Sequence, residues 1–175
     1  MRPDKDCMLC GLHSGRTIMV LPCGDPSSKV CFVGEAPGEK EDLSGTPFVG
    51  RSGKLLDRML LEEGVERESI RITNTVKCRP PGNRDPIQEE MDACRPFLLA
   101  ELQDCEAVVA LGRSACRSLA GLTSPMKEMA NKRMSLDVGG REILLIPTYH
   151  PAACIYRKEA REGLRETIRT IRPLV

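Results

Sequence analysis

Short apolar runs alternate along this chain with amphipathic segments. Four of the apolar runs predict buried strands, at residues 29–34, 70–76, 107–112 and 142–147. Four segments with apolar side chains at helical spacing predict helices, at residues 54–63, 87–102, 113–119 and 157–171. Strands that alternate with helices predict an α/β fold in which helices cover both faces of a parallel sheet.

Two segments between these elements are rich in glycine and proline, at residues 34–53 and 78–86. A loop as long as the first is usually functional. The carboxyl ends of parallel strands meet at one edge of a sheet, where ligands bind. We therefore expect the loops that follow Val33, Thr73 and Ile146 to converge on one site. The segment before Ser28 is predicted to be irregular.

The size and charge of the chain narrow the alternatives. Its 175 residues predict one domain, spanning residues 1–175. The net charge is only +1, so a nucleic-acid partner must be inferred from local basic patches. No apolar run approaches the roughly 20 residues of a membrane span, and residues 1–6 lead into no apolar stretch of a signal peptide. We expect a cytoplasmic protein without a membrane partner.

The chain has nine cysteines, an odd number that argues against a disulfide framework in a chain without a secretion signal. Cys7-x-x-Cys10 together with Cys78 and Cys94 could bind zinc or a [4Fe–4S] cluster. Fifteen residues separate the second pair, unlike the repeated C-x-x-C of a zinc ribbon, which favours iron–sulfur. The alternative is that all four are core thiols. Five further cysteines compete as ligands, of which Cys31 and Cys116 are predicted to be buried: Cys23, Cys31, Cys105, Cys116 and Cys154.

Four features at the predicted sheet edge could carry chemistry. The glycine turn around Glu35 exposes backbone N–H groups and could be a ligand site or a plain loop. Phe48 could offer a flat face to a base or pack in the core. Asn74 could bond a pyrimidine edge or cap a turn. His150, one of two histidines, could be functional or structural.

These motifs occur together and in order: Gly34-Glu-Ala-Pro-Gly38, Pro47-Phe-Val-Gly50, Thr73-Asn-Thr-Val-Lys-Cys-Arg-Pro-Pro81 and His150-Pro-Ala-Ala153. In this respect the chain resembles the family 4 uracil-DNA glycosylases from Cys7 to about Arg157, and the four-cysteine spacing also matches. The resemblance implies a three-layer α/β/α sandwich with a central, mainly parallel four-stranded sheet. It also implies that the protein flips uracil out of DNA and hydrolyses its N-glycosidic bond, leaving free uracil and an abasic site.

The resemblance further implies how the base is bound. Phe48 is expected to stack on uracil, Asn74 to bond its O4 and N3, and His150 to face its O2. Whether His150 acts as a neutral imidazole or as an imidazolium stays open, although a closed pocket favours the neutral form.

Four residues are implied in catalysis or in holding the attacking water. Glu35 and the backbone of Ala36 are expected to hold the water, while Glu41 and Asn83 match two further positions tied to the same site. The cofactor implied is a [4Fe–4S] cluster on Cys7, Cys10, Cys78 and Cys94.

One position departs from the family pattern. Many members place a leucine shortly after His-Pro to fill the gap left by the flipped base, where this chain has Cys154 and Ile155. We expect Ile155 to take that role.

The partner implied is uracil-containing DNA, single- or double-stranded, bound by a monomer. Two basic clusters flank the expected site, and a third lies in a methionine-rich segment: Lys77, Arg79 and Arg84; Arg157, Lys158 and Arg161; Lys127, Lys132 and Arg133. Each could also be a solvated face. A non-catalytic nucleic-acid-binding domain and a glycosylase for other deaminated bases remain as alternatives.

Overall fold

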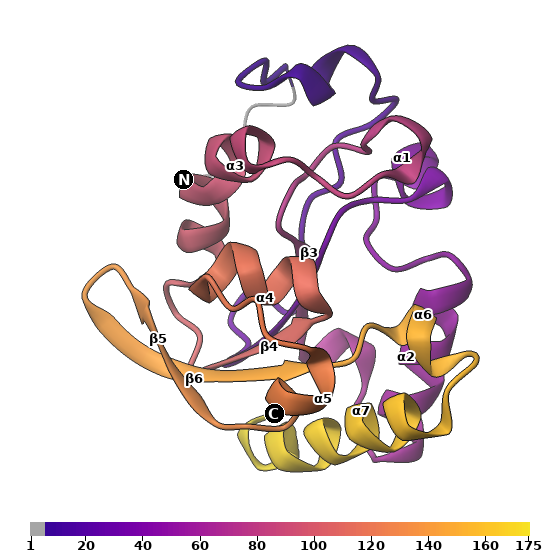
Figure 1. Cartoon of the computed structure of the whole chain (residues 1–175), viewed down its shortest axis with the longest axis vertical. Helices are drawn as coiled ribbons and strands as arrows, with labels where there is room; N and C mark the ends of the chain where they lie inside the picture. The colour runs from indigo at the N-terminus through magenta and orange to yellow at the C-terminus, as the bar shows by residue number, and fades with distance from the viewer. Residues whose placement is uncertain (1–5) are drawn as a thin grey trace.

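The computed structural model describes residues 6–175. Most of the segment from which we expect no signal peptide, residues 1–5, lies outside the described part of the chain. Six strands form one sheet in the order β1-β3-β2-β4-β6-β5 (Figure 1). The four central strands are parallel, namely β3 (Arg71–Asn74), β2 (Val30–Gly34), β4 (Ala107–Leu111) and β6 (Arg141–Thr148). The edge strands β1 (Cys23–Gly24) and β5 (Met134–Val138) are antiparallel to their neighbours.

The expected four-stranded sheet is therefore wrong in its strand count, although the parallel centre was predicted. The extra strand β1 has only two residues, too few to form a pattern. The extra strand β5 pairs with β6 as a hairpin across Gly139 and Gly140, both with positive φ. It lies in the methionine-rich segment and alternates apolar and polar residues over only five positions, so it forms no apolar run of the kind that marked the central strands.

Seven α-helices occur in the described residues: α1 (Glu39–Ser44), α2 (Arg51–Glu62), α3 (Gln88–Leu102), α4 (Arg113–Ala120), α5 (Met126–Met129), α6 (Pro151–Cys154) and α7 (Lys158–Ile171). Four short 3₁₀ turns join them: η1 (Gly11–Ser14), η2 (Arg67–Ser69), η3 (Pro81–Asn83) and η4 (Arg172–Leu174). The predicted loop at residues 34–53 thus contains α1 and the start of α2. Helix α2 begins three residues before the predicted start.

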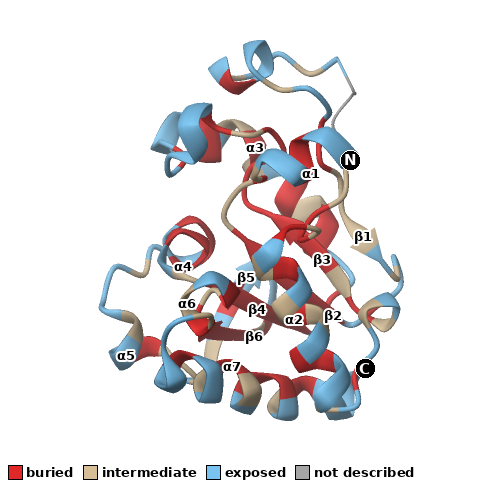
Figure 2. Cartoon of the chain, turned by 90° about the vertical axis from the view of Figure 1, so that its right-hand side faces the viewer, coloured by how far each residue is buried: buried red, intermediate tan, exposed pale blue. Residues whose placement is uncertain are grey.

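Helices cover both faces of the sheet and give three layers. Alternate residues of β2 point to opposite faces, as a strand requires. Phe32 packs with Leu56 of α2 and Leu164 of α7 in one core cluster. Val33 packs with Leu98 of α3 and, in the same second cluster, residues of α4. The buried strands between the two helical layers are visible in Figure 2.

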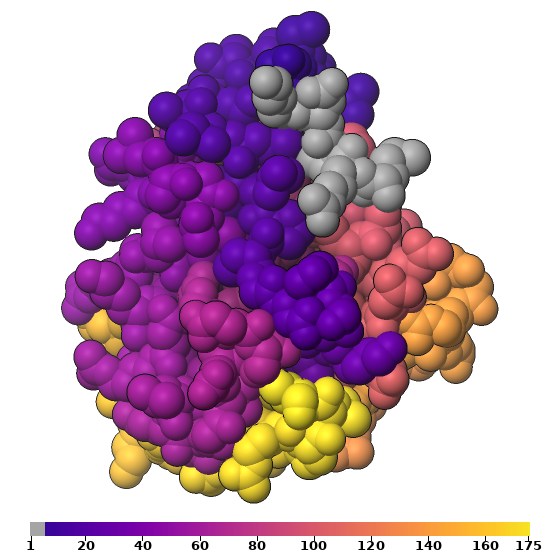
Figure 3. Space-filling model, turned by 180° about the vertical axis from the view of Figure 1, so that it is seen from behind, coloured from indigo at the N-terminus to yellow at the C-terminus, as the bar shows by residue number. Residues whose placement is uncertain are grey.

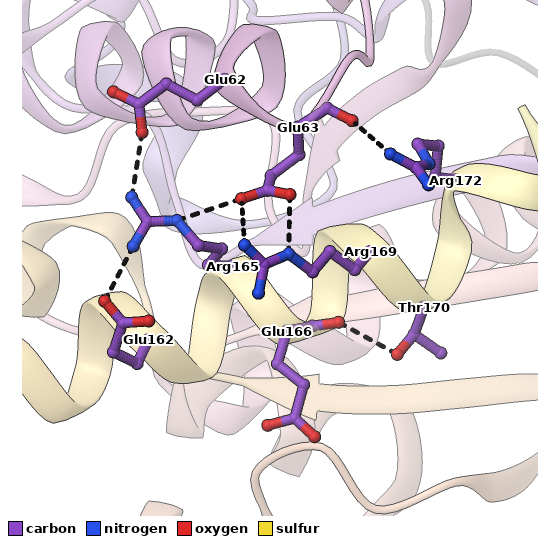
Figure 4. Close-up of polar contacts among 8 residues, drawn as sticks. All are labelled: Glu62, Glu63, Glu162, Arg165, Glu166, Arg169, Thr170 and Arg172. Carbon is purple, nitrogen blue, oxygen red and sulfur yellow. Dashed lines mark hydrogen bonds and ion pairs between the residues drawn. The ribbon is translucent and has the colours of Figure 1, made fainter.

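Ion pairs fasten α7 to the carboxyl end of α2 (Figure 4). Arg169 binds both carboxylate oxygens of Glu63, at 2.7 and 3.0 Å. Arg165 binds Glu63 at 3.1 Å and Glu62 at 3.0 Å. The Arg169 hydrogen bond is the main reason that the pKa of Glu63 is lowered. Because these pairs are near the surface, we assign them to orienting the helices rather than to a large part of the stability.

The N-terminal segment forms a small third core against α3. Leu12 and Met19 pack there with Met91 and with two of the predicted cysteine ligands, Cys78 and Cys94. Figure 3 shows this segment, in indigo, at the top of the molecule and running down its back. Within residues 6–175, no helix combines the length and apolar character that crossing a bilayer requires.

Candidate functional site

A cavity of about 440 Å³ opens at the carboxyl ends of the parallel strands. Its walls come from the loops after β2, β3 and β6, which were predicted to converge. The register explains this, since Gly34 at the end of β2 lies opposite Asn74 at the end of β3. Seven residues expected at the site all line this cavity: Glu35, Ala36, Glu41, Phe48, Asn74, Asn83 and His150.

Phe48 is held in an unusual backbone conformation. Its φ of 55° lies in the left-handed region, and only 5% of the residue is exposed. Arg67 donates hydrogen bonds to the carbonyls of Pro47 at 2.5 Å and of Phe48 at 3.3 Å. Gly53 packs so closely that a Cβ there would lie 1.8 Å from the Phe48 carbonyl oxygen. These contacts hold the ring 5.7 Å from the His150 ring, measured between centroids.

Asn74 is 3% exposed and its side chain faces the cavity beside Phe48. A Cβ placed on Gly34 would lie 2.5 Å from Asn74 Oδ1 and 2.5 Å from Phe48 Cζ. The missing side chain at Gly34 therefore lets the amide and the ring approach each other. Among residues 6–175, none forms a hydrogen bond with the Asn74 side chain, so its donor and acceptor are both available to a ligand.

His150 caps the amino end of α6. Its Nδ1 accepts a hydrogen bond from the backbone N–H of Ala152 at 3.1 Å. Because a backbone N–H can only donate, this contact places the proton of the neutral ring on Nε2. Burial lowers the pKa of His150 to about 4, against a smaller opposing effect of Glu41. At neutral pH this favours an uncharged ring that donates from Nε2, the form that a closed pocket also favours.

The two acidic residues of the cavity have different surroundings. Oε1 of Glu41 accepts backbone N–H bonds from Val49 at 3.0 Å and Gly50 at 2.8 Å, so this carboxylate also fixes the loop that carries Phe48. Glu35 is half-buried at the cavity wall, and burial raises its pKa. Glu35 therefore keeps a larger fraction of the neutral acid than an exposed glutamate would.

Asn83 lies on the rim of the cavity. It is exposed, its φ of 56° is left-handed, and its Oδ1 accepts a hydrogen bond from Arg79 Nε at 2.7 Å. This hydrogen bond orients the Asn83 side chain toward Arg79.

Lys77 was expected to be a surface cation facing DNA, and that prediction is wrong. Its side chain is 1% exposed and forms an ion pair with Glu101 at 2.7 Å. It also donates to Thr73 Oγ1 and to the backbone carbonyl of Asn74, each at 2.7 Å. This support beneath Asn74 was not predicted, because Glu101 lies 24 residues later on α3 and nothing local marks it as a partner of Lys77.

The four predicted ligand cysteines, Cys7, Cys10, Cys78 and Cys94, line one small cavity with apolar neighbours such as Met19 and Phe97. Arg16 donates to Cys78 Sγ at 3.5 Å and to the Cys7 carbonyl at 2.6 Å. Burial raises the pKa of Cys94 to about 11.

In the described part of the chain, no three His, Cys, Asp or Glu side chains are close enough to share a single metal ion. Cys31 and Cys116 are fully buried elsewhere, as predicted. The remaining three cysteines also lie away from this cavity: Cys23, Cys105 and Cys154.

The fold and the cavity define a class of protein, an α/β domain that can hold a planar ring between an aromatic face, an amide and a neutral imidazole. The model of the uracil DNA glycosylase superfamily matches residues 21–172, so the chain belongs to that superfamily.

Within the superfamily, the chain belongs to the type-4 family. It is 38% identical to the type-4 uracil-DNA glycosylase of Archaeoglobus fulgidus, over 98% of this chain and 89% of the relative. It is 41% identical to the type-4 enzyme of Sulfurisphaera tokodaii, over 96% of this chain and 80% of the relative. It is 43% identical to the type-4 enzyme of Thermotoga maritima, over 85% of this chain and 77% of the relative.

Proposed function

We propose that this protein is a DNA repair glycosylase that flips uracil out of DNA and hydrolyses its N-glycosidic bond. The products are free uracil and an abasic site. One observation carries the proposal: Phe48, Asn74 and the neutral His150 line one cavity at the edge of the sheet. The names of the type-4 relatives support the same reaction.

Each of the three residues has a distinct task toward the flipped base. Phe48 stacks on the uracil ring. Asn74 accepts from N3–H through its oxygen and donates to O4 through its nitrogen. His150 donates from Nε2 to O2, where negative charge develops as the bond to the sugar breaks. Flipping costs a few kcal/mol, which favours unpaired or mismatched uracil.

The remaining polar residues act on the sugar and the water. Glu35 and the backbone of Ala36 hold the attacking water, and the carboxylate favours the oxocarbenium character of the deoxyribose. Glu41 keeps Phe48 in place through Oε1, which leaves Oε2 for the site. Asn83 acts on the same part of the substrate from the rim of the cavity. Uracil leaves as an anion whose O2 accepts a hydrogen bond from Nε2 of His150. The water oxygen bonds to the sugar carbon, and the proton that the water loses passes by way of Glu35 to N1 of the released uracil.

Incubation of the purified protein with an oligonucleotide that contains one uracil tests the proposal. We expect a single alkali-labile break at that position and release of uracil. A matched strand with cytosine or hypoxanthine at the same position measures any shift in preference. Binding without a break would instead indicate a non-catalytic DNA-binding domain.

Asn74→Asp is expected to weaken uracil selectivity. The substitution replaces the donor to O4 with a second oxygen, which repels O4 but accepts from the amino group of cytosine. Since a bidentate edge contact contributes about 1–3 kcal/mol, uracil excision should fall roughly five- to 150-fold. The measurement is single-turnover cleavage of matched uracil and cytosine strands, and unchanged uracil excision would remove Asn74 from the site.

We also propose that Cys7, Cys10, Cys78 and Cys94 hold a [4Fe–4S] cluster in a structural role. Four thiols that line one small cavity with apolar neighbours, two of them from a C-x-x-C pair, suit a cluster ligated by four thiolates. When bound, the cluster supplies cross-links between the N-terminal segment, the loop after β3 and helix α3. The residues of this chain then supply the apolar shell and the hydrogen bond from Arg16.

Protein purified without oxygen is expected to be brown, with about four iron and four sulfide per chain if all four thiolates bind one cubane. A Cys94→Ser variant should lose thermal stability by a larger factor than it loses intrinsic excision rate. The matched variant Cys116→Ser, at a buried cysteine outside the cavity, should keep the iron. Stoichiometric zinc without iron or sulfide would contradict the assignment.

The finer features of DNA binding are also proposals. The protein acts as a monomer in the cytoplasm, on single- or double-stranded DNA. The basic residues beside the site contact the backbone: Arg79, Arg84, Arg157, Lys158 and Arg161. Ile155 is half-buried and lies in a neighbouring groove rather than in the cavity wall, whereas Cys154 is 1% exposed. Of these two, Ile155 is therefore the better candidate to fill the gap left by the flipped base.

A further inference from the structure

A second groove, of about 420 Å³, lies beside the cavity between α2, α6 and α7. Five cationic side chains line it, and no acidic side chain does: Lys40, Arg51, Lys54, Arg58 and Arg161. The apolar parts of its wall are Leu55 and Ile155. We call this feature the basic groove. Its composition stands out in a chain whose net charge is only +1.

Three of the cations form one stripe on α2. Arg51, Lys54 and Arg58 are spaced by three and four residues, so they lie on the same face of the helix. At 1.5 Å per residue, the stripe is about 10 Å long. One strand of duplex DNA carries a phosphate about every 3.4 Å along the axis, so the stripe matches about three successive phosphates.

The charges of the basic groove are not neutralised within the protein. Within residues 6–175, Lys40, Lys54 and Arg58 form no ion pair, and no side-chain hydrogen bond engages them. Cations elsewhere on the same two helices, such as Arg165, are paired with glutamates. Like charges gathered without counter-charges favour a polyanionic partner.

The basic groove adjoins the cavity through the chain itself. Lys40 precedes Glu41 and Arg51 precedes Ser52, and both of these second residues line the cavity. The far wall comes from Ile155, at the end of the helix that starts directly after His150. Arg51 fixes that wall by donating to the hydroxyl of Tyr156 at 3.1 Å.

We propose that the basic groove binds the sugar–phosphate backbone of the strand that carries the uracil, on one side of the flipped nucleotide. This inference rests on the proposed glycosylase function and adds where the rest of the strand runs. Binding there would hold the strand beside the cavity while the base occupies it. The groove contacts phosphates and reads no sequence.

The test removes three charges that have no internal partner, in the triple variant Lys40→Gln, Lys54→Gln, Arg58→Gln. A matched control removes three charges from a surface that lines neither cavity nor groove, in Lys127→Gln, Lys132→Gln, Arg133→Gln. Arg51 and Arg161 are left intact because they also bond Tyr156 and the Cys154 carbonyl. The ligand is a duplex with 2′-fluoro-2′-deoxyuridine, whose fluorine prevents the oxocarbenium-like step.

The quantity measured is the dependence of Kd on salt. Each lost phosphate contact should reduce the slope of log Kd against log salt by about 0.9, so the groove variant should lose about 2 to 3 units of slope. The control variant should keep the wild-type slope. Equal slopes for wild type and groove variant, or an equal loss in both variants, would overturn the proposal.

A short substrate separates this inference from the proposed function. A uracil trinucleotide fills the cavity but is too short to follow the basic groove. The groove variant should therefore excise uracil from it within about twofold of the wild-type rate, while excision from a long strand shows a raised KM with kcat retained. Failure of the wild type on every substrate would refute the glycosylase function, whereas a wild-type KM in the groove variant on the long strand would refute the groove alone.

Discussion

His150→Ala is expected to lower the single-turnover rate of uracil excision by about a hundred- to a thousandfold. The reason is the direction of the Nε2–H donor. Nδ1 is occupied by the Ala152 N–H at 3.1 Å, so the proton of the neutral ring lies on the other nitrogen. A donor directed at O2 matters more in the transition state, where charge develops, than in the ground state. DNA affinity should therefore change little.

The pH dependence of the same rate checks the protonation state. Burial lowers the pKa of His150 to about 4, so the rate should stay level as pH passes through 6.5, where an exposed histidine titrates. His150→Gln, which keeps an N–H donor, should recover part of the rate lost in His150→Ala. An excision rate that falls as pH rises through 6.5 would point to an imidazolium instead. Excision by His150→Ala within a few-fold of wild type would transfer the catalysis to Glu35 and Glu41.

The lowered pKa also has a consequence for stability. Between pH 4 and 6.5 the unfolded chain protonates this histidine while the folded protein does not. The folded state thus binds fewer protons, and the contribution of His150 to stability is fully present above pH 6.5. It is lost as pH falls toward 4. Protonation would also convert Nδ1 from an acceptor into a donor and break the cap of α6.

Four residues of the cavity, Glu35, Phe48, Asn74 and His150, could be singled out from the sequence because each lies near a strand end or in a glycine-rich motif. Glu41 and Asn83 were implied only by the resemblance to the family. Glu35 directly follows an apolar run, Asn74 lies at the end of a strand and His150 lies shortly after one, and parallel strands bring such positions to one edge. The protonation state of His150 could not be predicted. It depends on the hydrogen bond from the backbone N–H of Ala152 to Nδ1, and on burial of the imidazole ring beside Phe48, which lies on a loop distant in the sequence.

The errors at the sheet edges have a local origin. An apolar run marks a strand that is covered on both faces, and β2 and β4 are of that kind. The edge strand β5 alternates apolar and polar residues over its five positions, but no apolar run marks it, and β1 has only two residues. Helix α1 was not predicted because it has only six residues, most of them polar, and a glycine lies at each end of it.

Lys77 shows a different limit of sequence reasoning. Between Val76 and Cys78, in a loop with two arginines, a lysine is normally a surface cation. The fold instead brings the helix that carries Glu101 beneath the end of β3. Such pairing depends on packing between elements far apart in the chain, which no local pattern records.

Lys77→Met is expected to lower the stability of the folded protein by about 3–5 kcal/mol, because it leaves the Glu101 carboxylate buried without its counter-charge. Glu101 is 8% exposed, and its Oε1 has no other partner in the described part of the chain. The Lys77 ammonium has three donors, and all three are used, toward Thr73, Asn74 and Glu101. For a chain of this size the loss corresponds to a melting temperature lower by roughly 6–20 °C.

The double variant Lys77→Met, Glu101→Leu separates the buried charge from the shape of the site. Removing both partners of a buried pair is often nearly neutral, so its melting temperature should return most of the way to that of the wild type. The carbonyl of Asn74 would still lack its donor, however, and the side-chain amide of Asn74, which lines the cavity, would be held less firmly. We therefore expect the double variant to regain stability but not the full uracil excision rate. Iron content measured on each variant shows whether the substitutions disturb the cluster proposed at the neighbouring Cys78. A single variant as stable as the wild type would mean that the Lys77–Glu101 pair does not stabilise the folded protein, and a double variant with full activity would mean that the ion pair does not position Asn74.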